Sequence, residues 1–285
     1  MPFPLVVTRR KVTSMFENFY DMKQSPFTRD ISPVSLYESA SMADALGRLA
    51  YVADRALFAV VTGDAGCGKS TLIRKFVTSL PKERYIVLYL SDSKLTPRWL
   101  YKSMLEQLSI DSRLYRGDAK RQLQKEIEFL RGAHQKKVVT ILDEAHLLER
   151  ETIEEFRFLL NDCFDSMSPM ALVLVGQTEL WDKLKLQSYA AVRGRIDMTC
   201  ILPRLERAQT NDYINAHLVY AGGKVEIFTD KAIDDVHRHS NGIARLINRI
   251  CEKSLMYASQ QNKRLIDEHI IRYILEHEML NGGDF

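Results

Sequence analysis

The chain has 285 residues, of which 46% are hydrophobic, and its formal net charge is +3. It is therefore long enough to bury one substantial core and a smaller second one. The near-neutral charge excludes nucleic-acid binding through a global field and leaves only a local basic patch. The four cysteines show no C-x-x-C spacing, which favours a reducing cytoplasm and argues against a cysteine metal site. No apolar run reaches the ~18 residues of a membrane span and no signal peptide is evident, so we expect a cytoplasmic protein that does not enter a membrane.

Strand and helix patterns alternate along the first two thirds of the chain. Short apolar, β-branched runs predict strands at residues 57–62, 85–90, 137–142, 171–175 and 197–202. Apolar residues at helical spacing predict helices at residues 41–55, 97–108, 118–131 and 151–164, with one more after residue 70 and a short one after residue 175. This alternation predicts a three-layer α/β domain around a parallel sheet.

The strand pattern disappears from about residue 205. The remaining segments read as helices near residues 206–221, 229–239, 243–260 and 267–279. Pro203 and the charged segment 204–207 mark the boundary. We therefore predict a flexible basic arm at residues 1–14, an α/β core at residues 15–204 and a small helical lid domain at residues 205–285.

The most specific pattern follows the first predicted strand. Residues 61–71 read V-T-G-D-A-G-C-G-K-S-T and fit G-x-x-x-x-G-K-[ST], the P-loop that binds nucleotide phosphates. Glycines let backbone N–H groups turn toward the phosphates, and the following helix N-terminus adds partial positive charge. A Gly-rich turn that matches by chance is the weaker alternative, because a strand and a helix flank the match. The predicted ATP-binding residues are Gly63, Asp64, Ala65, Gly66, Cys67, Gly68, Lys69, Ser70 and Thr71.

Within this loop, two side chains have separate expected roles. Lys69 is expected to reach the β- and γ-phosphates, and Ser70 to bind Mg²⁺ through its hydroxyl.

A pair of acids ends the third predicted strand. Asp143 and Glu144 follow the run 137–142, so they stand at the sheet edge where open α/β folds bind ligands. We expect Asp143 to hold Mg²⁺ directly or through water, and Glu144 to polarise the water that attacks the γ-phosphate. A solvated turn is the alternative, but its pairing with a P-loop favours a catalytic site. The second acid favours hydrolysis over binding alone.

The fourth predicted strand ends in polar residues. Gln177 follows this strand directly and Thr178 comes next. A polar side chain here is expected to point between the P-loop and the acid pair, close to the γ-phosphate. Gln177 is the preferred γ-phosphate sensor and Thr178 the second choice. Without the P-loop and the acid pair, this segment would be interpreted as an ordinary turn between a strand and a helix.

Taken together, these features resemble the AAA+ ATPases, and among them the ExeA-like ATPases, which grade into transposition regulators of the TnsC and MuB type. The similar segments are residues 24–27, 36–39, 63–70, 142–148, 175–180, 193–196, 221–223, 227–229 and 240–248. The resemblance spans residues 15–277 and implies sheet order 5-1-4-3-2, ATP and Mg²⁺ as ligands, and an ATP-dependent homo-oligomer, either a ring or a helical filament. Many members carry Thr where Ser70 stands here, an exchange that keeps the metal-binding hydroxyl.

The resemblance also gives roles to arginines that would otherwise read as surface residues. Arg195, just before the last strand, matches the arginine finger that enters the neighbouring subunit's nucleotide site, with Arg193 as the alternate. Arg245 matches the second sensor, which contacts the γ-phosphate from the lid. An always-charged, planar guanidinium suits both roles because negative charge develops on the γ-phosphate oxygens.

For biological function, the resemblance implies a prokaryotic ATPase that coats duplex DNA without sequence preference. Such a protein recruits or activates a transposase at target DNA, in some systems with a target-selector protein. ExeA-like secretion relatives carry a membrane helix and a cell-wall-binding domain, and this sequence ends at Phe285 without either, which favours the transposition type. The candidate DNA phosphate contacts are Lys94, Arg98, Arg116, Lys120 and Arg121, with the basic arm. A solvated charged face is the alternative for each of them.

Two other functions stay open at this point. The first is an ATPase assembly factor of a secretion or envelope complex, with protein as its substrate. The second is a helicase, suggested by D-E-A-H at residues 143–146. It is weaker, because the chain lacks the length for a second motor domain and His146 follows the family pattern.

Overall fold

The computed structural model describes residues 15–28, 30–92, 95–160 and 168–279. The chain divides into two compact units. One unit is Glu38–Pro203, and the other joins the described residues before Glu38 to the described residues from Arg204 onward. The predicted arm at residues 1–14 lies outside the described part of the chain.

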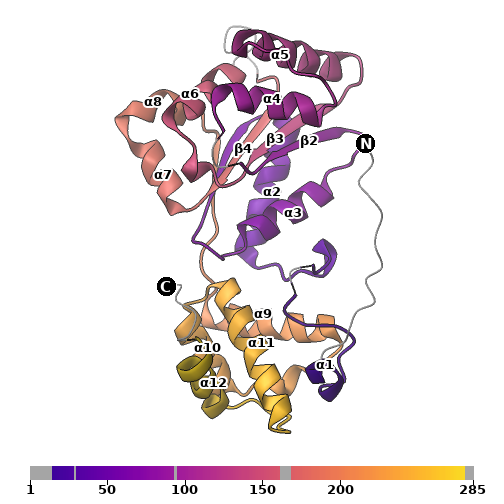
Figure 1. The fold of residues 1–285 in the computed structure, drawn as a ribbon, viewed down its shortest axis with the longest axis vertical. Helices are drawn as coiled ribbons and strands as arrows, with labels where there is room; N and C mark the ends of the chain where they lie inside the picture. The colour runs from indigo at the N-terminus through magenta and orange to yellow at the C-terminus, as the bar shows by residue number, and fades with distance from the viewer. Residues whose placement is uncertain (1–14, 29, 93–94, 161–167, 280–285) are drawn as a thin grey trace. The chain divides into compact units, whose positions relative to one another are not determined.

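The first unit is built on a five-stranded parallel sheet (Figure 1). Its strands are β1 (Phe58–Thr62), β2 (Tyr85–Leu90), β3 (Lys137–Leu142), β4 (Ala171–Gly176) and β5 (Met198–Ile201). Their order is β2-β3-β4-β1-β5, which is the expected order 5-1-4-3-2 read from the opposite edge. Every pairing is parallel. The predicted α/β core with its parallel sheet is therefore confirmed.

Helices cover both faces of this sheet, so that the unit has three layers (Figure 1). On one face lie α2 (Ala40–Arg55) and α3 (Lys69–Ser79). On the other lie α4 (Pro97–Gln107), α5 (Arg116–Gly132), α6 (Arg150–Leu159), α7 (Thr178–Lys185) and α8 (Ala190–Arg193). Successive side chains of a strand point to opposite faces, so Val60 packs on the second set of helices and Val61 on the first. Burial on both faces explains why the central strands β1, β3 and β4 read as continuous apolar runs rather than alternating ones.

The second unit is helical and has its own apolar core. Its helices are α1 (Met15–Phe19), α9 (Arg207–Ala221), α10 (Asp230–Ser240), α11 (Ala244–Gln260) and α12 (Glu268–Ile274), the last followed by a π-helical turn at Leu275–Met279. The last four helices match the predicted positions, whereas α1 was not predicted.

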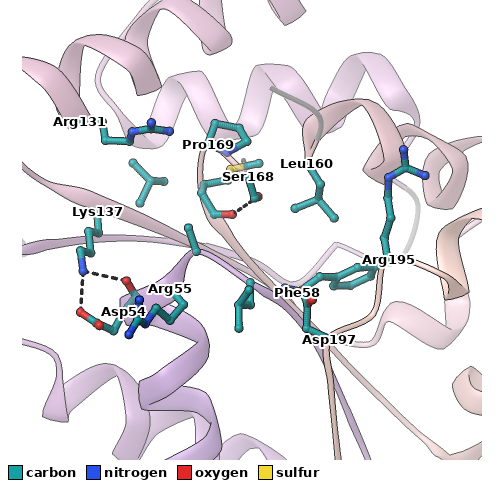
Figure 2. Close-up of a pocket in the computed structure, with 14 residues that line it drawn as sticks. Asp54, Arg55, Phe58, Arg131, Lys137, Leu160, Ser168, Pro169, Arg195 and Asp197 are labelled. Atoms are coloured by element: carbon teal, nitrogen blue, oxygen red, sulfur yellow. Dashed lines mark hydrogen bonds and ion pairs between the residues drawn. The ribbon is translucent and has the colours of Figure 1, made fainter. Parts of the chain in front are cut away.

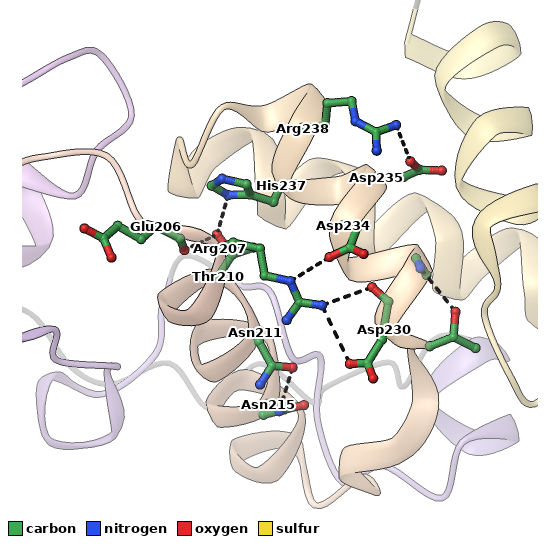
Figure 3. A network of polar contacts seen from close by, with 12 residues as sticks. Glu206, Arg207, Thr210, Asn211, Asn215, Asp230, Asp234, Asp235, His237 and Arg238 are labelled. Carbon is green, nitrogen blue, oxygen red and sulfur yellow. Dashed lines mark hydrogen bonds and ion pairs between the residues drawn. The ribbon is translucent and has the colours of Figure 1, made fainter.

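Polar contacts tie α9 to α10 in this unit (Figure 3). The Arg207 Nε donates to Asp234 Oδ1 at 2.6 Å, and the Thr210 hydroxyl lies 3.0 Å from His237 Nδ1. A buried carboxylate, Asp235, accepts from Arg238 on its own helix and from Arg272 on α12. These contacts link α10 to α9 through one group of side chains and to α12 through another.

The boundary of the helical unit differs from the predicted division at residue 205. Residues 15–37 were assigned to the α/β core, but they pack with the helices that follow Arg204. Phe16 and Tyr20 are buried in the helical core, and the Tyr20 hydroxyl donates to the Lys263 carbonyl at 3.0 Å. Farther along, the Phe27 ring stacks on His217 of α9. Burial of these aromatic side chains stabilises the packing of this segment more than its polar contacts do, because large aromatic side chains remove much apolar surface from water.

Candidate functional site

The P-loop has the backbone geometry that phosphate binding requires. It runs from Gly63 at the end of β1 to Gly68, the residue that precedes α3. Gly66 has φ +85° and Gly68 has φ +100°, which a residue with a Cβ adopts only at a cost. A Cβ on Gly63 would lie 2.8 Å from the Leu202 carbonyl oxygen. The loop can therefore bind the phosphates of a nucleoside triphosphate with its backbone N–H groups. These glycines let the N–H groups face a ligand at the N-terminus of a helix.

The lysine of this loop is folded back over it. Lys69 is only 7% exposed, and its ammonium donates to the carbonyls of Gly63 at 2.8 Å and Asp64 at 2.9 Å. The positive charge is thus held above the loop, where a phosphate would meet it. Ser70 follows on the exposed first turn of α3, with Thr71 half-buried beside it.

The acid pair follows β3, as predicted, and its two members have different environments. Asp143 is 7% exposed, and its Oδ1 accepts the N–H of Glu144 at 2.9 Å. Glu144 has φ 52° and ψ 32°, a left-handed conformation that costs a residue with a side chain about 1 kcal/mol or more. The Asp143 carboxylate on its N–H and the Leu147 N–H on its carbonyl hold this conformation. Strain of this kind accumulates where side-chain direction matters for function.

A tyrosine that the sequence did not single out holds the second oxygen of Asp143. The Tyr89 hydroxyl donates to Asp143 Oδ2 at 2.6 Å. Burial, the hydrogen bond to Asp143 and nearby carboxylate charge raise the pKa of Tyr89 above its usual range, so the hydroxyl stays protonated and acts as the donor. The side-chain amide of Gln107 on α4 pairs with both backbone groups of Tyr89, at 2.9 and 2.8 Å. Because β2 is an edge strand, this amide takes the place of a further strand and fixes Tyr89 from outside the sheet.

We expect Tyr89→Phe to raise the Mg²⁺ concentration needed for half-maximal ATP hydrolysis by about tenfold, since a group that orients a metal ligand has effects of this size. A Mg²⁺ titration of phosphate release measures it. Tyr85→Phe, at the other end of β2, is the matched control and is expected to change nothing. An unchanged Mg²⁺ dependence in Tyr89→Phe would show that Asp143 needs no such support.

The predicted sensor lies on the strand between the other two parts of the site. β4 pairs with β1 on one side and with β3 on the other, so Gln177 at its end lies between the P-loop and the acid pair. It is the N-cap residue of α7, while Thr178 is exposed. The Gln177 Nε2 lies 3.2 Å from Nε2 of His146, and His146 Nδ1 lies 3.4 Å from the Glu144 Oε2. The structure therefore connects the predicted sensor and the predicted base through one imidazole ring.

Comparison with known families agrees with this arrangement. Residues 52–184 match the family described as "AAA domain", a segment that contains the P-loop, the acid pair and Gln177. This segment of the chain is therefore similar to the AAA domain. The α/β unit of the chain is the P-loop, AAA-like fold that the sequence predicted.

A curated relative is similar over most of the chain. General secretion pathway protein A of Aeromonas hydrophila is 32% identical over 251 residues, which is 86% of this chain and 45% of that protein. The chain therefore spans about half the length of this relative.

Solved structures show the same fold at low sequence identity. The Drosophila ORC, in a structure bound to DNA, has a TM-score of 0.66 at 19% identity and covers 98% of this chain and 70% of that one. Cdc6p from Pyrobaculum aerophilum has a TM-score of 0.62 at 17% identity, over 85% of this chain and 67% of that one. At these identities the likeness concerns the AAA fold alone.

The arginines assigned by resemblance lie in three different settings. Arg193, at the end of α8, donates to the Leu184 carbonyl at 3.0 Å and to the Lys185 carbonyl, so it caps the C-terminus of α7. Arg195 follows on the loop before β5 and donates to the Ala191 carbonyl at 3.2 Å. Arg245 is exposed on α11 in the helical unit, and its role as second sensor stays a prediction. Both Arg193 and Arg195 therefore donate to backbone carbonyls, and the choice of Arg195 as the finger stays a prediction.

Arg195 also lines a cavity of about 560 Å³ at the other end of the sheet (Figure 2). This cavity lies at the amino ends of the strands, next to Phe58 and Asp197, whereas the P-loop and the acid pair follow the carboxyl ends. In Figure 2, Lys137 donates to Asp54 on the opposite side of the cavity from Arg195. This cavity is therefore separate from the candidate nucleotide site.

The candidate DNA contacts are partly engaged with other side chains. Arg116 pairs with Glu151 and the buried Glu155, and Arg121 lies 3.7 Å from Asp118. The Lys120 ammonium lies 4.3 Å from the centre of the Phe158 ring, and burial lowers its pKa. Arg98 is exposed on α4, and Lys94 lies outside the described residues. Acidic partners thus offset the charge of Arg116 and Arg121.

We expect bound ATP to protect Cys67 from alkylation, because this half-exposed thiol lies inside the phosphate loop. Cys200 and Cys251 are buried, and burial raises the pKa of both thiols, so they react slowly with or without nucleotide. Iodoacetamide labelling of a Cys163→Ala protein, read by peptide mass, measures the rate at Cys67. Equal rates with and without MgATP would contradict the position of the nucleotide.

We looked for helices that could cross a membrane in the part of the chain that the structure describes. None of the helices there combines the length and the apolar character that crossing a bilayer requires.

Proposed function

We propose that this chain is a Mg²⁺-dependent ATPase that drives the assembly of a secretion or envelope complex, with protein as its substrate. The observation that supports the catalytic part is the strand order, because the P-loop, Gln177 and the acid pair follow the carboxyl ends of the adjacent strands β1, β4 and β3. The similarity to General secretion pathway protein A over 86% of the chain supports the biological part.

In this proposal each residue of the site has one task. The loop amides and Lys69 bind the phosphates, and Glu144 accepts a proton from the attacking water. Ser70 and Asp143 would hold Mg²⁺, which would supply positive charge to offset the negative charge of the phosphates. The donors fit this ion, since hydroxyl and carboxylate oxygens are the ligands it prefers.

The active site is completed, in the same proposal, by a second copy of the chain. Arg195 would supply positive charge to a neighbour's γ-phosphate, and Arg245 would report nucleotide state to the helical unit. ATP would then control assembly of a homo-oligomer, and the oligomer would act on its protein partner.

Regulation of transposition is the reading that the sequence favoured, and the comparisons give it less support than the secretion reading. The named curated relative is a secretion protein, and the likeness to proteins solved with DNA concerns the fold alone. Two of the candidate DNA contacts, Arg116 and Arg121, also carry acidic partners. Transposase and duplex DNA as partners therefore find no specific support in the described residues.

A gel-shift assay separates the two readings. The full chain is mixed with non-specific duplex DNA at low salt, with MgADP, with Mg-AMP-PNP or without nucleotide, and phosphate release is measured in parallel. We expect ATP hydrolysis that duplex DNA does not stimulate, and no nucleotide-dependent shift. A shift that needs AMP-PNP, ignores sequence and weakens steeply with salt would restore the DNA reading.

A further inference from the structure

One histidine lies between the predicted phosphate sensor and the predicted catalytic base. His146 belongs to the 3₁₀ turn η2 (Ala145–Leu147), and its side chain is 10% exposed. Its Nδ1 lies 3.4 Å from Glu144 Oε2, and its Nε2 lies 3.2 Å from Gln177 Nε2. The Gln177 backbone N–H also points to Nδ1, at 3.4 Å. Both ring nitrogens are therefore engaged, each with a residue of the proposed reaction.

The contacts of this ring depend on which nitrogen carries the proton. A neutral imidazole has one donor and one acceptor. When Nδ1 carries the proton, the ring donates to Glu144 and accepts from the Gln177 amide at Nε2. When Nε2 carries it, Nδ1 accepts the Gln177 backbone N–H and no longer holds Glu144. The two tautomers therefore correspond to a restrained and a released Glu144.

Backbone contacts keep these three residues together. Lys183 on α7 donates to the carbonyls of His146 at 3.3 Å and Leu148 at 2.6 Å, so η2 is fastened to the helix that Gln177 caps. Gly176 allows this approach, because a Cβ there would lie 3.2 Å from the His146 backbone nitrogen and 2.9 Å from the Leu180 side chain. The relation between sensor and ring is thus fixed by packing.

We propose that His146 relays occupancy of the γ-phosphate position from Gln177 to Glu144. The inference rests on the proposed ATPase function and names a regulatory residue of that site. His146 is a positioning residue, because it acts through Glu144 and touches no reacting atom.

The relay follows from hydrogen-bond chemistry. Phosphate oxygens accept hydrogen bonds and do not donate, so a phosphate beside Gln177 draws the amide N–H groups away from the ring. Nε2 then lacks its donor and takes up a proton from solvent. Nδ1 releases its proton to solvent on the side of Glu144, whose side chain is half-exposed. The net charge of the ring is therefore unchanged. Glu144 then loses its contact with Nδ1 and is released to polarise water. In the absence of a γ-phosphate the ring keeps Glu144 engaged.

The first test uses nucleotide affinity, which does not depend on turnover. If binding of the γ-phosphate must break the contact between Gln177 and His146, removing the ring nitrogens should tighten binding of AMP-PNP. We expect His146→Phe to bind Mg-AMP-PNP about fivefold tighter than wild type, the size of one net hydrogen bond, and to bind MgADP unchanged. His134→Phe, outside these contacts, is the matched control and should change neither affinity. Titration calorimetry measures both nucleotides.

A purely structural role for His146 predicts a different result. Loss of packing would weaken both nucleotides together, and that outcome overturns the relay, as does an unchanged AMP-PNP to ADP ratio. If wild-type protein binds neither nucleotide, the proposed ATPase function itself fails. The two failures are therefore distinguishable.

The second test observes the ring directly in wild-type protein. Long-range ¹H–¹⁵N spectra of ¹⁵N-histidine-labelled protein report which ring nitrogen carries the proton, and the His146 signals among the seven histidines are those lost in His146→Phe or His146→Asn. We expect protonated Nδ1 with MgADP and protonated Nε2 with Mg-AMP-PNP. In Gln177→Ala the AMP-PNP shift should disappear. One tautomer in both nucleotide states would overturn the proposal.

Discussion

Glu144→Gln is expected to lower kcat for ATP hydrolysis by about 10²–10⁴-fold while leaving ATP affinity within about twofold of wild type. Glutamine has the shape of glutamate but cannot accept a proton from the attacking water. Asp143 and Lys69 are untouched, and both remain in place to bind the metal and the phosphates. Phosphate release and nucleotide titration on the same preparation separate the two quantities.

The control for this experiment is Lys69→Ala, which removes the ammonium that lies over the loop. This variant is expected to lose ATP binding itself, so the two changes affect different steps. Near-wild-type turnover in Glu144→Gln would contradict the assignment of the catalytic base. A loss of binding in Glu144→Gln would show that the residue acts on the ground state instead.

The sequence predicted the α/β core well because each structural signal there is local. β3 begins and ends where its apolar run does, since both faces of this central strand are buried. The edge strand β2 was also placed correctly, because its run of β-branched and aromatic residues is continuous although it is only partly buried. The P-loop motif could be placed because strand, glycines and helix follow one another directly in the chain. Sheet order is not a local property, and the resemblance to a family supplied it.

The contacts that organise the site could not be predicted in the same way. Tyr89 reaches Asp143 across 54 positions of sequence, and His146 reaches Gln177 across 31. Nothing in the residues around Tyr89 indicates that its hydroxyl faces the acid pair. The D-E-A-H pattern drew attention to His146, but only the fold shows which side chains lie on either side of its ring.

The position of residues 15–37 was wrongly predicted for a related reason. Aromatic residues such as Phe16 and Phe27 indicate burial but do not indicate the core in which burial occurs. A segment that precedes a domain in sequence is easily assigned to that domain. Here the helices that accept it lie beyond Arg204, so a long-range packing choice decides the boundary.

Arg195 lies just before β5, at the amino ends of the strands, and this position indicates which nucleotide site it can reach. Asp197 pairs with Phe58 at the start of β1, and the P-loop begins five residues later at the other end of the strand. Five residues of extended chain span about 16 Å, farther than an arginine side chain reaches. Arg195 is therefore too far along the sheet to act on the P-loop of its own chain. This distance supports a role in a neighbouring copy.

Arg195→Ala is accordingly expected to bind ATP normally and to hydrolyse it about 10³-fold more slowly, the effect typical of removing an arginine finger. Turnover per subunit of the wild type should rise with protein concentration, because each site is completed only by assembly. Mixing Arg195→Ala with Lys69→Ala subunits should restore part of the activity. In that mixture Lys69→Ala subunits supply the arginine, and Arg195→Ala subunits hold the nucleotide.

The matched control is Arg55→Ala, since Arg55 lines the same cavity as Arg195 and its loss tests for a general effect of charge there. It should leave turnover and its concentration dependence unchanged. The mixing experiment assumes that Lys69→Ala subunits still assemble, which light scattering of the mixture checks. Normal activity in Arg195→Ala would move the finger to another residue, with Arg193 next. A turnover per subunit that stays flat across concentration would mean that one chain forms a complete active site by itself.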